Sequence, residues 1–302
     1  MRALPISVAL LSAMAAPLSN ARAQERTVAM PTVEQIQKMQ DAAPAEPAVA
    51  PKQPRKVLVW GRMHAHQPNP YAARALQIMG EKSGAFEAVV SEDPATLLPE
   101  SLDQYDGLVM NNIHEREPFL PPNFDELPKN EQTAAEEMRS RIQGSILDFV
   151  AGGKGIVGIH AATAALQGWQ EYGEMMGGYY GGHIAQEVAI KLDDPDHPVN
   201  ACFEGKGFRI HDEIYISREP YSRERVRVLL SLDLTQMDDP GKRPDKDYAV
   251  SWVRAYGKGR VFYSTLGHFL ETYWNPLALR HFLAGIQFAL GDLEGDTTPS
   301  IE

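Results

Sequence analysis

An apolar run that ends on a histidine constrains this fold more than any other segment. Residues 155–159 read GIVGI, and His160, two alanines and Thr163 follow. A short apolar run beside glycines indicates a buried strand. In a parallel α/β sheet, ligands bind at the carboxyl ends of the strands. A single histidine there would more often be a hydrogen-bonded core residue, but several other histidines end similar runs, which favours a site.

Strands and helices alternate in the first half of the chain. Apolar periodicity and stop signals predict strands at 56–60, 86–90, 106–112 and 155–160, with helices at 71–82 and 131–150. This alternation predicts a parallel, doubly wound sheet. The second half predicts strands without long helices between them, at 188–192, 208–216, 226–232, 249–256 and 260–265, and then a helix at 276–290. We therefore expect an α/β fold, mostly parallel and doubly wound, with an antiparallel extension in the second half.

The ends of the chain predict export. Residues 1–23 have one early arginine, a short apolar stretch and a small-x-small ending at Ala23, which is typical of a secretory signal peptide cleaved near Ala23. Residues 24–54 are rich in alanine and proline and predict a flexible tether, with a short helix near 33–41. The domain itself is expected at 55–292, followed by a disordered tail at 293–302. A secreted or periplasmic protein follows, without membrane insertion, because no later segment is apolar for long enough.

Charge and cysteine content exclude several classes of function. The formal net charge is −11, which argues against nucleic acid or an anionic membrane surface as a partner. Cys202 is the only cysteine, so neither an intramolecular disulfide nor a cysteine-based zinc site can form. The chain has no phosphate-binding P-loop, no Gly-x-Gly-x-x-Gly after the first strand and no Gly-x-Ser-x-Gly. A nucleotide cofactor and a serine-hydrolase elbow are therefore not expected.

Histidines at predicted strand ends and loops form the candidate site. His160, His183 and His268 are the proposed ligands of a divalent metal, zinc or a similar ion. The adjacent acids Asp212 and Glu213 are candidates for a catalytic base or a further ligand. His64, after the first strand, is a further catalytic candidate. The same groups could instead form acid/base pairs, because histidine titrates near neutral pH. His197, His281 and His114 are assigned to a turn, to packing and to solvent, respectively.

These residues also carry a family resemblance. The run from Gly158 to Thr163, the segment 177–183, the acids Asp212 and Glu213 with Tyr215, and Leu266-Gly267-His268 resemble the ThuA-like (trehalose utilisation) family. The resemblance extends from about residue 55 to 290. It implies a flavodoxin-like fold, akin to class I glutamine amidotransferases. In those enzymes a nucleophilic cysteine follows a central strand, but here His160 takes that position, so thiolate chemistry is not expected.

The resemblance implies a protein that acts on carbohydrate. We expect it to cleave a disaccharide or a 3-keto-glycoside by hydrolysis or elimination, with assistance from a metal. A small-molecule sugar is then the partner, and an oligomer is compatible with the sequence. Trp60, Asn111, Asn112, Tyr179 and Thr163 are the candidates for sugar contacts. The alternatives are a non-catalytic sugar-binding module and a protein scaffold. The proline-rich insert at 113–129 is either a lid or a surface decoration.

Overall fold

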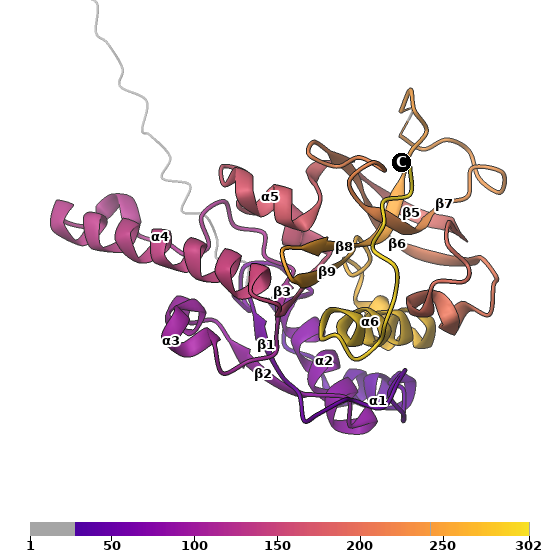
Figure 1. The fold of residues 1–302 in the computed structure, drawn as a ribbon, viewed down its shortest axis with the longest axis horizontal. Coiled ribbons are helices and arrows are strands. Elements are labelled where there is room, and N and C mark those ends of the chain that lie inside the picture. The colour runs from indigo at the N-terminus through magenta and orange to yellow at the C-terminus, as the bar shows by residue number, and fades with distance from the viewer. Residues whose placement is uncertain (1–27, 242, 302) are drawn as a thin grey trace, which may run out of the picture.

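One mixed sheet organises the chain. The computed structural model describes residues 28–241 and 243–301. Within these residues, nine strands form one sheet in the order β2-β1-β3-β4-β9-β8-β7-β5-β6 (Figure 1). The strands are β1 (Lys56–Trp60), β2 (Glu87–Ser91), β3 (Gly107–Asn111), β4 (Gly155–Ile159), β5 (Tyr179–Leu192), β6 (Phe208–Arg218), β7 (Arg227–Leu232), β8 (Ala249–Tyr256) and β9 (Gly259–Ser264).

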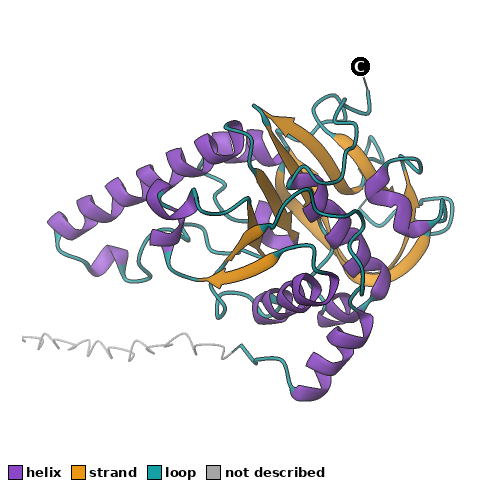
Figure 2. Cartoon of the chain, turned by 60° about the horizontal axis from the view of Figure 1, so that its bottom comes forward, coloured by secondary structure: helices purple, strands orange, loops and turns teal. Residues whose placement is uncertain are grey.

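The helices cover both faces of this sheet (Figure 2). They are α1 (Val33–Ala42), α2 (Asn69–Ser83), α3 (Pro99–Leu102), α4 (Lys129–Ala151), α5 (Gln170–Met176) and α6 (Pro276–Ala289). Short 3₁₀ turns lie at Pro94–Leu97, Phe124–Glu126, His160–Thr163, Pro198–Phe203 and Leu270–Trp274. Helices α1, α2 and α6 pack into one core, and α3, α4 and α5 pack into the other. The expected α/β class is confirmed. Among the described residues, none of the helices combines the length and the apolarity that a membrane crossing needs.

The first five strands in the sheet, from β2 to β9, pair in parallel. Their order is the 2-1-3-4-5 order of doubly wound sheets, in which ligands bind at the carboxyl ends of the strands. The remaining pairs, from β9 to β6, are antiparallel, as the lack of long helices in that half predicts. The carboxyl ends of β1, β3, β4 and β9 consequently share one edge of the sheet.

Strand β5 begins nine residues earlier than the 188–192 prediction, at Tyr179. The glycines at 181 and 182 hide the apolar alternation of a strand, and the register shifts between Tyr180 and His183. Tyr180 is paired with Ser217, but His183 is paired with Tyr215, so β5 has one extra residue there. Such a bulge changes which face the following side chains take. His183 therefore lies on the strand face of Tyr215 and Glu213.

The two terminal segments differ from the expectations. The segment expected as a tether packs on the domain: Met39 of α1 is fully buried, and Gln287 of α6 accepts hydrogen bonds from the backbone of Ala48 and Val49. The tail expected to be disordered is also hydrogen bonded, with Ser300 donating to the carbonyl of Val226. Both segments pack on the domain through contacts between residues far apart in the sequence, which local composition cannot predict. The expected signal peptide at 1–23 lies outside the described residues.

Candidate metal centre

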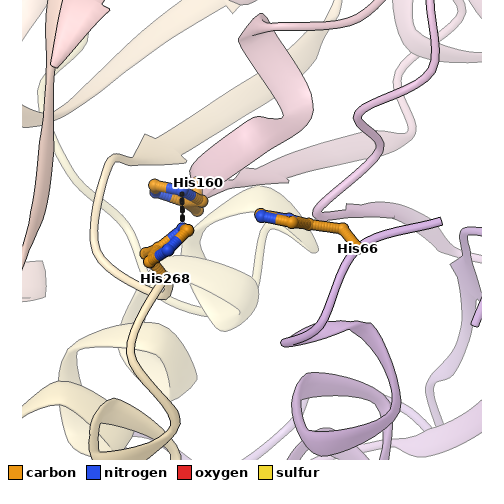
Figure 3. A group of neighbouring side chains, drawn as sticks. All are labelled: His66, His160 and His268. Atoms are coloured by element: carbon orange, nitrogen blue, oxygen red, sulfur yellow. Dashed lines mark hydrogen bonds between the residues drawn. The ribbon is translucent and has the colours of Figure 1, made fainter. Parts of the chain in front are cut away.

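Three histidines converge at the carboxyl edge of the parallel strands. His66 comes from the loop after β1, His160 follows β4, and His268 lies in the loop after β9. One ring nitrogen from each lies within 4.8 Å of the others, and Figure 3 shows the three rings facing a common point. The structure thus brings His160 and His268 together, as the strand-end argument predicts. The third member is His66, whereas His64 is exposed on the same loop.

His160 is held in one orientation by the backbone. It has a φ of 45°, which a non-glycine residue adopts only when the surrounding structure imposes it. The side chain is fully buried. Its Nδ1–H donates to the carbonyl of Thr265 at 2.6 Å, so Nε2 carries the lone pair and accepts a hydrogen bond from Nδ1–H of His268 at 3.3 Å. Burial lowers the pKa of His160 well below its ordinary value, which keeps the ring neutral.

His66 and His268 are neutral for the same reason. Burial, together with the neighbouring imidazoles His114 and His268, lowers the pKa of His66 to about 3. Burial also lowers the pKa of His268, although Glu213 opposes that shift. The Nδ1 atom of His66 is buried and has no hydrogen-bond partner among the described residues. Neutral imidazoles with free lone pairs are the form in which histidine binds metals.

The two adjacent acids have separate roles. Asp212 is fully buried and accepts hydrogen bonds from the backbone N–H groups of Gly267, His268 and Phe269 and from the hydroxyl of Thr272. It therefore fixes the loop that carries His268, and its side chain is closed to solvent; its expected catalytic role stays a prediction. Glu213 instead faces the imidazoles. Its Oε1 lies 3.6 Å from Nε2 of His160 and 3.7 Å from Nδ1 of His268.

His183 lies beside this group and outside the three-histidine cluster. Its Nε2 is 3.7 Å from Oε2 of Glu213, and its Nδ1 is hydrogen bonded to the hydroxyl of Tyr180 at 2.8 Å. The side chain is 47% exposed, so it forms the solvent side of the group. The structure thus places all three predicted ligands around Glu213, with His183 on the second carboxylate oxygen.

The residues expected to bind sugar are mostly buried. Trp60 is fully buried, and its Nε1–H donates to the carbonyl of Asp93. The Tyr179 hydroxyl donates to the carbonyls of Leu166 and Trp169. Neither aromatic ring therefore offers a platform for a sugar, because both side chains are buried within the fold.

The remaining polar candidates are also held within the fold. Thr163 pairs its hydroxyl with that of Tyr263 at 2.8 Å. Asn111 donates to the carbonyl of Asn69, and Asn112 donates to the Tyr273 hydroxyl. All three are buried and hydrogen bonded within the fold, and their expected sugar contacts stay a prediction.

The insert at 113–129 is anchored next to the centre. Phe119 is buried against Trp60 and Trp169, with ring centroids 5.3 and 6.3 Å away. The guanidinium of Arg62 donates to two carbonyls of the insert. His114, which we assigned to solvent, is exposed but stacks on His66 with a centroid distance of 5.0 Å. The insert therefore forms a wall of the site.

The sequence analysis missed His66 and Tyr215 as members of the centre. Tyr215 packs its ring 4.2 Å from that of His160. The available signal for His66 was its position after the first strand, which it shares with His64. Strand alternation from Glu213 would have placed Tyr215 on the same face. Burial raises the pKa of the Cys202 thiol to about 11, so this cysteine stays protonated at neutral pH.

Fold and site together define an α/β protein with a histidine and carboxylate centre at the carboxyl edge of its parallel strands. Three neutral imidazoles in this arrangement could hold a divalent metal. The chain belongs to the ThuA family, described as trehalose utilisation, whose model matches residues 56–289.

Solved structures share the fold. A ThuA-like protein from Bacteroides uniformis is 21% identical, with a TM-score of 0.60, and the match covers 84% of this chain and 98% of that one. A ThuA-like protein from Parabacteroides merdae is 17% identical, with a TM-score of 0.55 and coverage of 81% and 93%. A cytoplasmic protein of Salmonella typhimurium is 14% identical, with a TM-score of 0.52 and coverage of 78% and 98%. No curated protein matches the chain at the significance required.

Proposed function

We propose that this protein is a carbohydrate-processing enzyme that cleaves a 3-keto-glycoside or disaccharide with the help of a divalent metal. The convergence of His66, His160 and His268, with ring nitrogens within 4.8 Å of one another, carries the proposal. The donor set fits a zinc-like ion, because the three rings are neutral and one buried nitrogen of His66 has no partner among the described residues. Membership of a family described as trehalose utilisation supports a carbohydrate substrate.

The chemistry of a 3-keto-glycoside suits such a centre. The C2 hydrogen lies next to the C3 carbonyl, and the glycosidic oxygen is bonded to C1. Removal of the C2 proton and loss of the aglycone from C1 is an elimination, in which the leaving oxygen takes up a proton. Addition of water to the new double bond then completes a net hydrolysis. A bound cation would polarise the carbonyl, and Glu213 could either accept the proton or bind the cation.

Two further parts of the proposal concern export and fold type. We propose that residues 1–23 direct the chain out of the cytoplasm, and that the parallel half of the sheet is of the flavodoxin-like type. The alternative of a non-catalytic sugar-binding module is less favoured, because Trp60 and Tyr179 are buried and offer no aromatic platform. N-terminal sequencing of the protein recovered from a periplasmic fraction would test the expected cleavage after Ala23.

Turnover assays test the enzymatic proposal. We expect 3-keto-trehalose to be cleaved faster than trehalose, with activity lost after chelation and restored by a divalent ion. The matched variants are His66→Gln and His64→Gln, two residues apart in one loop. The first should lose activity, and the second should retain it, because His64 is exposed and lies outside the three-histidine cluster; a loss of activity in His64→Gln would instead support its expected catalytic role. No product from either keto or plain glycosides would overturn the proposed activity, and full activity in metal-free protein would overturn the role of the ion.

A further inference from the structure

We propose that Glu213 is a ligand of the ion in this centre, together with His160 and His268, and that His183 and Tyr180 position its carboxylate. This inference rests on the proposed function in one respect, since it requires a divalent cation in the histidine cluster. It then assigns Glu213 to binding the cation in place of accepting the substrate proton.

Three donor atoms form a triangle of the size that a metal ion requires. Nε2 of His160 and Nδ1 of His268 are 3.3 Å apart, and Oε1 of Glu213 lies 3.6 and 3.7 Å from them. In a tetrahedral site with bonds of about 2.0 to 2.2 Å, two ligand atoms lie roughly 3.3 to 3.6 Å apart. The triangle therefore matches one face of a coordination tetrahedron. Two histidines and a glutamate are also a known ligand set for catalytic zinc.

The distances to Glu213 are not those of hydrogen bonds. All three nitrogen to oxygen separations, including the one to His183, are 3.6 or 3.7 Å, which is beyond the usual range. The Glu213 side chain is only 11% exposed, and a buried carboxylate needs a compensating partner. The neighbouring Asp212 shows the contrast, because its oxygens accept four hydrogen bonds from the loop at 267–272. A cation between Glu213 and the imidazoles would supply the compensation.

The surrounding contacts orient the histidine ligands. Nδ1–H of His160 donates to the Thr265 carbonyl, which directs Nε2 at the triangle. Metal-binding histidines usually donate their other N–H in this way. The backbone N–H of His268 donates to Asp212, which fixes the loop. His66 approaches from the opposite side of the cluster (Figure 3), and the one remaining position of the tetrahedron is open to His66 or to a substrate.

His183 and Tyr180 lie beside the second oxygen of Glu213. The Tyr180 hydroxyl is hydrogen bonded to Nδ1 of His183, and Nε2 of His183 faces Oε2 of Glu213. The bulge in β5 places His183 on this face of the sheet. His183 therefore acts through Glu213, as a positioning residue. Outer partners of this kind change metal affinity by about 10 to 100-fold.

Titration of the metal-free full chain with Co²⁺ and Zn²⁺ tests the assignment. Wild-type protein should bind about one equivalent, with a visible cobalt spectrum of an ion in a low-symmetry site. Glu213→Gln should weaken binding by roughly 100-fold or more and change that spectrum. His183→Gln and Tyr180→Phe should each weaken binding by about tenfold, and the double variant should be no weaker than His183→Gln alone, because the two residues act through one contact. His211→Gln is the matched control, because His211 is an exposed histidine on β6, the strand that carries Glu213. Its affinity and cobalt spectrum should match those of wild type.

The outcomes separate this inference from the proposed function. If wild-type protein binds neither ion, the metal centre itself is wrong. If wild type binds but Glu213→Gln keeps the same affinity and spectrum, Glu213 is not a ligand, while the three-histidine centre stands. Glu213→Asp provides a second test should the glutamine variant fail to fold, because it keeps the charge but withdraws the oxygens by one methylene. An unchanged affinity and spectrum in that folded variant would equally overturn the assignment.

Discussion

Asp212 and Glu213 show how a single strand position decides the role of a side chain. They are neighbours on β6, and successive side chains of a strand point to opposite faces. Asp212 binds the backbone of the His268 loop, whereas Glu213 faces the imidazoles. Burial raises the pKa of Asp212 against the hydrogen bonds that lower it. Asp212 consequently supports the loop that carries His268, whereas Glu213 faces the imidazoles directly.

We predict that Asp212→Asn destabilises the protein by about 3 kcal/mol, because an amide replaces one of two acceptor oxygens and hydrogen bonds to a charged group are worth about 1.5 to 3 kcal/mol each. Urea unfolding in the presence of a chelator measures this. Asp93→Asn is the control, since Asp93 is an exposed cap on the backbone of Ala95 and asparagine caps equally well. Equal stability of wild type and Asp212→Asn would contradict the assigned structural role.

The sequence determines the residues of the centre only in part. His160 and His268 follow apolar strands, so the rule that carboxyl ends share an edge places them together. His64 and His66 lie two positions apart in one loop, and nothing local distinguishes them. Their difference comes from the fold, which exposes His64 and stacks the ring of His66 on those of His114 and His160.

At the level of elements, the bulge in β5 determines which face His183 takes. Gly182 has a φ of 145° there, and a Cβ at this position would meet only the end of Ile216, at 3.9 Å. Backbone conformation, rather than space, therefore requires glycine.

We predict that Gly182→Val destabilises the protein by about 1 to 3 kcal/mol and weakens metal binding, because the strain displaces His183. Thermal unfolding and a Co²⁺ titration measure the two effects. Gly168→Ala is the control, since its Cβ would meet nothing within 4 Å and no positive φ is involved. A Gly182→Val protein that matches wild type in both measurements would show that the bulge is not required.

Local pattern predicts elements well where it is continuous. The strands at 56–60 and 249–256 are confirmed to the residue, because each is an apolar run between turn residues. Strand β5 was predicted too short, since its glycines carry no side-chain pattern. The burial of Trp60 could not be predicted in the same way. In a strand that is covered on both faces, the apolar pattern is continuous and does not indicate which side chains reach solvent.

At the scale of the whole molecule, buried neutral histidines link stability to pH. Burial lowers the pKa of His281 to about 3, and its Nε2 pairs with the hydroxyl of Ser251. The unfolded chain binds the proton near pH 6.5, whereas the folded chain does not until about pH 3. Unfolding therefore takes up a proton in this window, and stability falls as the pH falls through it.

We predict that His281 lowers the free energy of unfolding by about 2 kcal/mol as the pH falls from 7.5 to 5. His281→Gln should show a shallower decline of the unfolding free energy over this range, whatever its stability at pH 7.5. Urea unfolding with chelator present at each pH measures it. Parallel curves for wild type and His281→Gln would contradict the prediction.

The segment before the family domain completes the core, which composition alone could not indicate. Met39 is fully buried against the domain. The side-chain oxygen of Gln287 accepts hydrogen bonds from the backbone N–H groups of Ala48 and Val49, and its side-chain nitrogen donates to the carbonyl of Val49. The Lys52 N–H donates to Asp292 at 3.0 Å. Removing the segment would expose apolar surface of α2 and leave the buried amide of Gln287 without its partners.

We predict that a chain beginning at Arg55 is less stable than one beginning at Gln24 by about 5 kcal/mol, from roughly 2 to 3 kcal/mol for the burial of Met39 and 1 to 3 kcal/mol for the unsatisfied amide. Within the longer chain, Met39→Ala should cost about 2 to 5 kcal/mol, whereas Met30→Ala, at a side chain that is 61% exposed, should change little. Equilibrium unfolding of the four proteins decides the matter. If the chain from Arg55 unfolds at the same denaturant concentration as the longer one, the segment is a tether after all, and its contacts contribute no net stability.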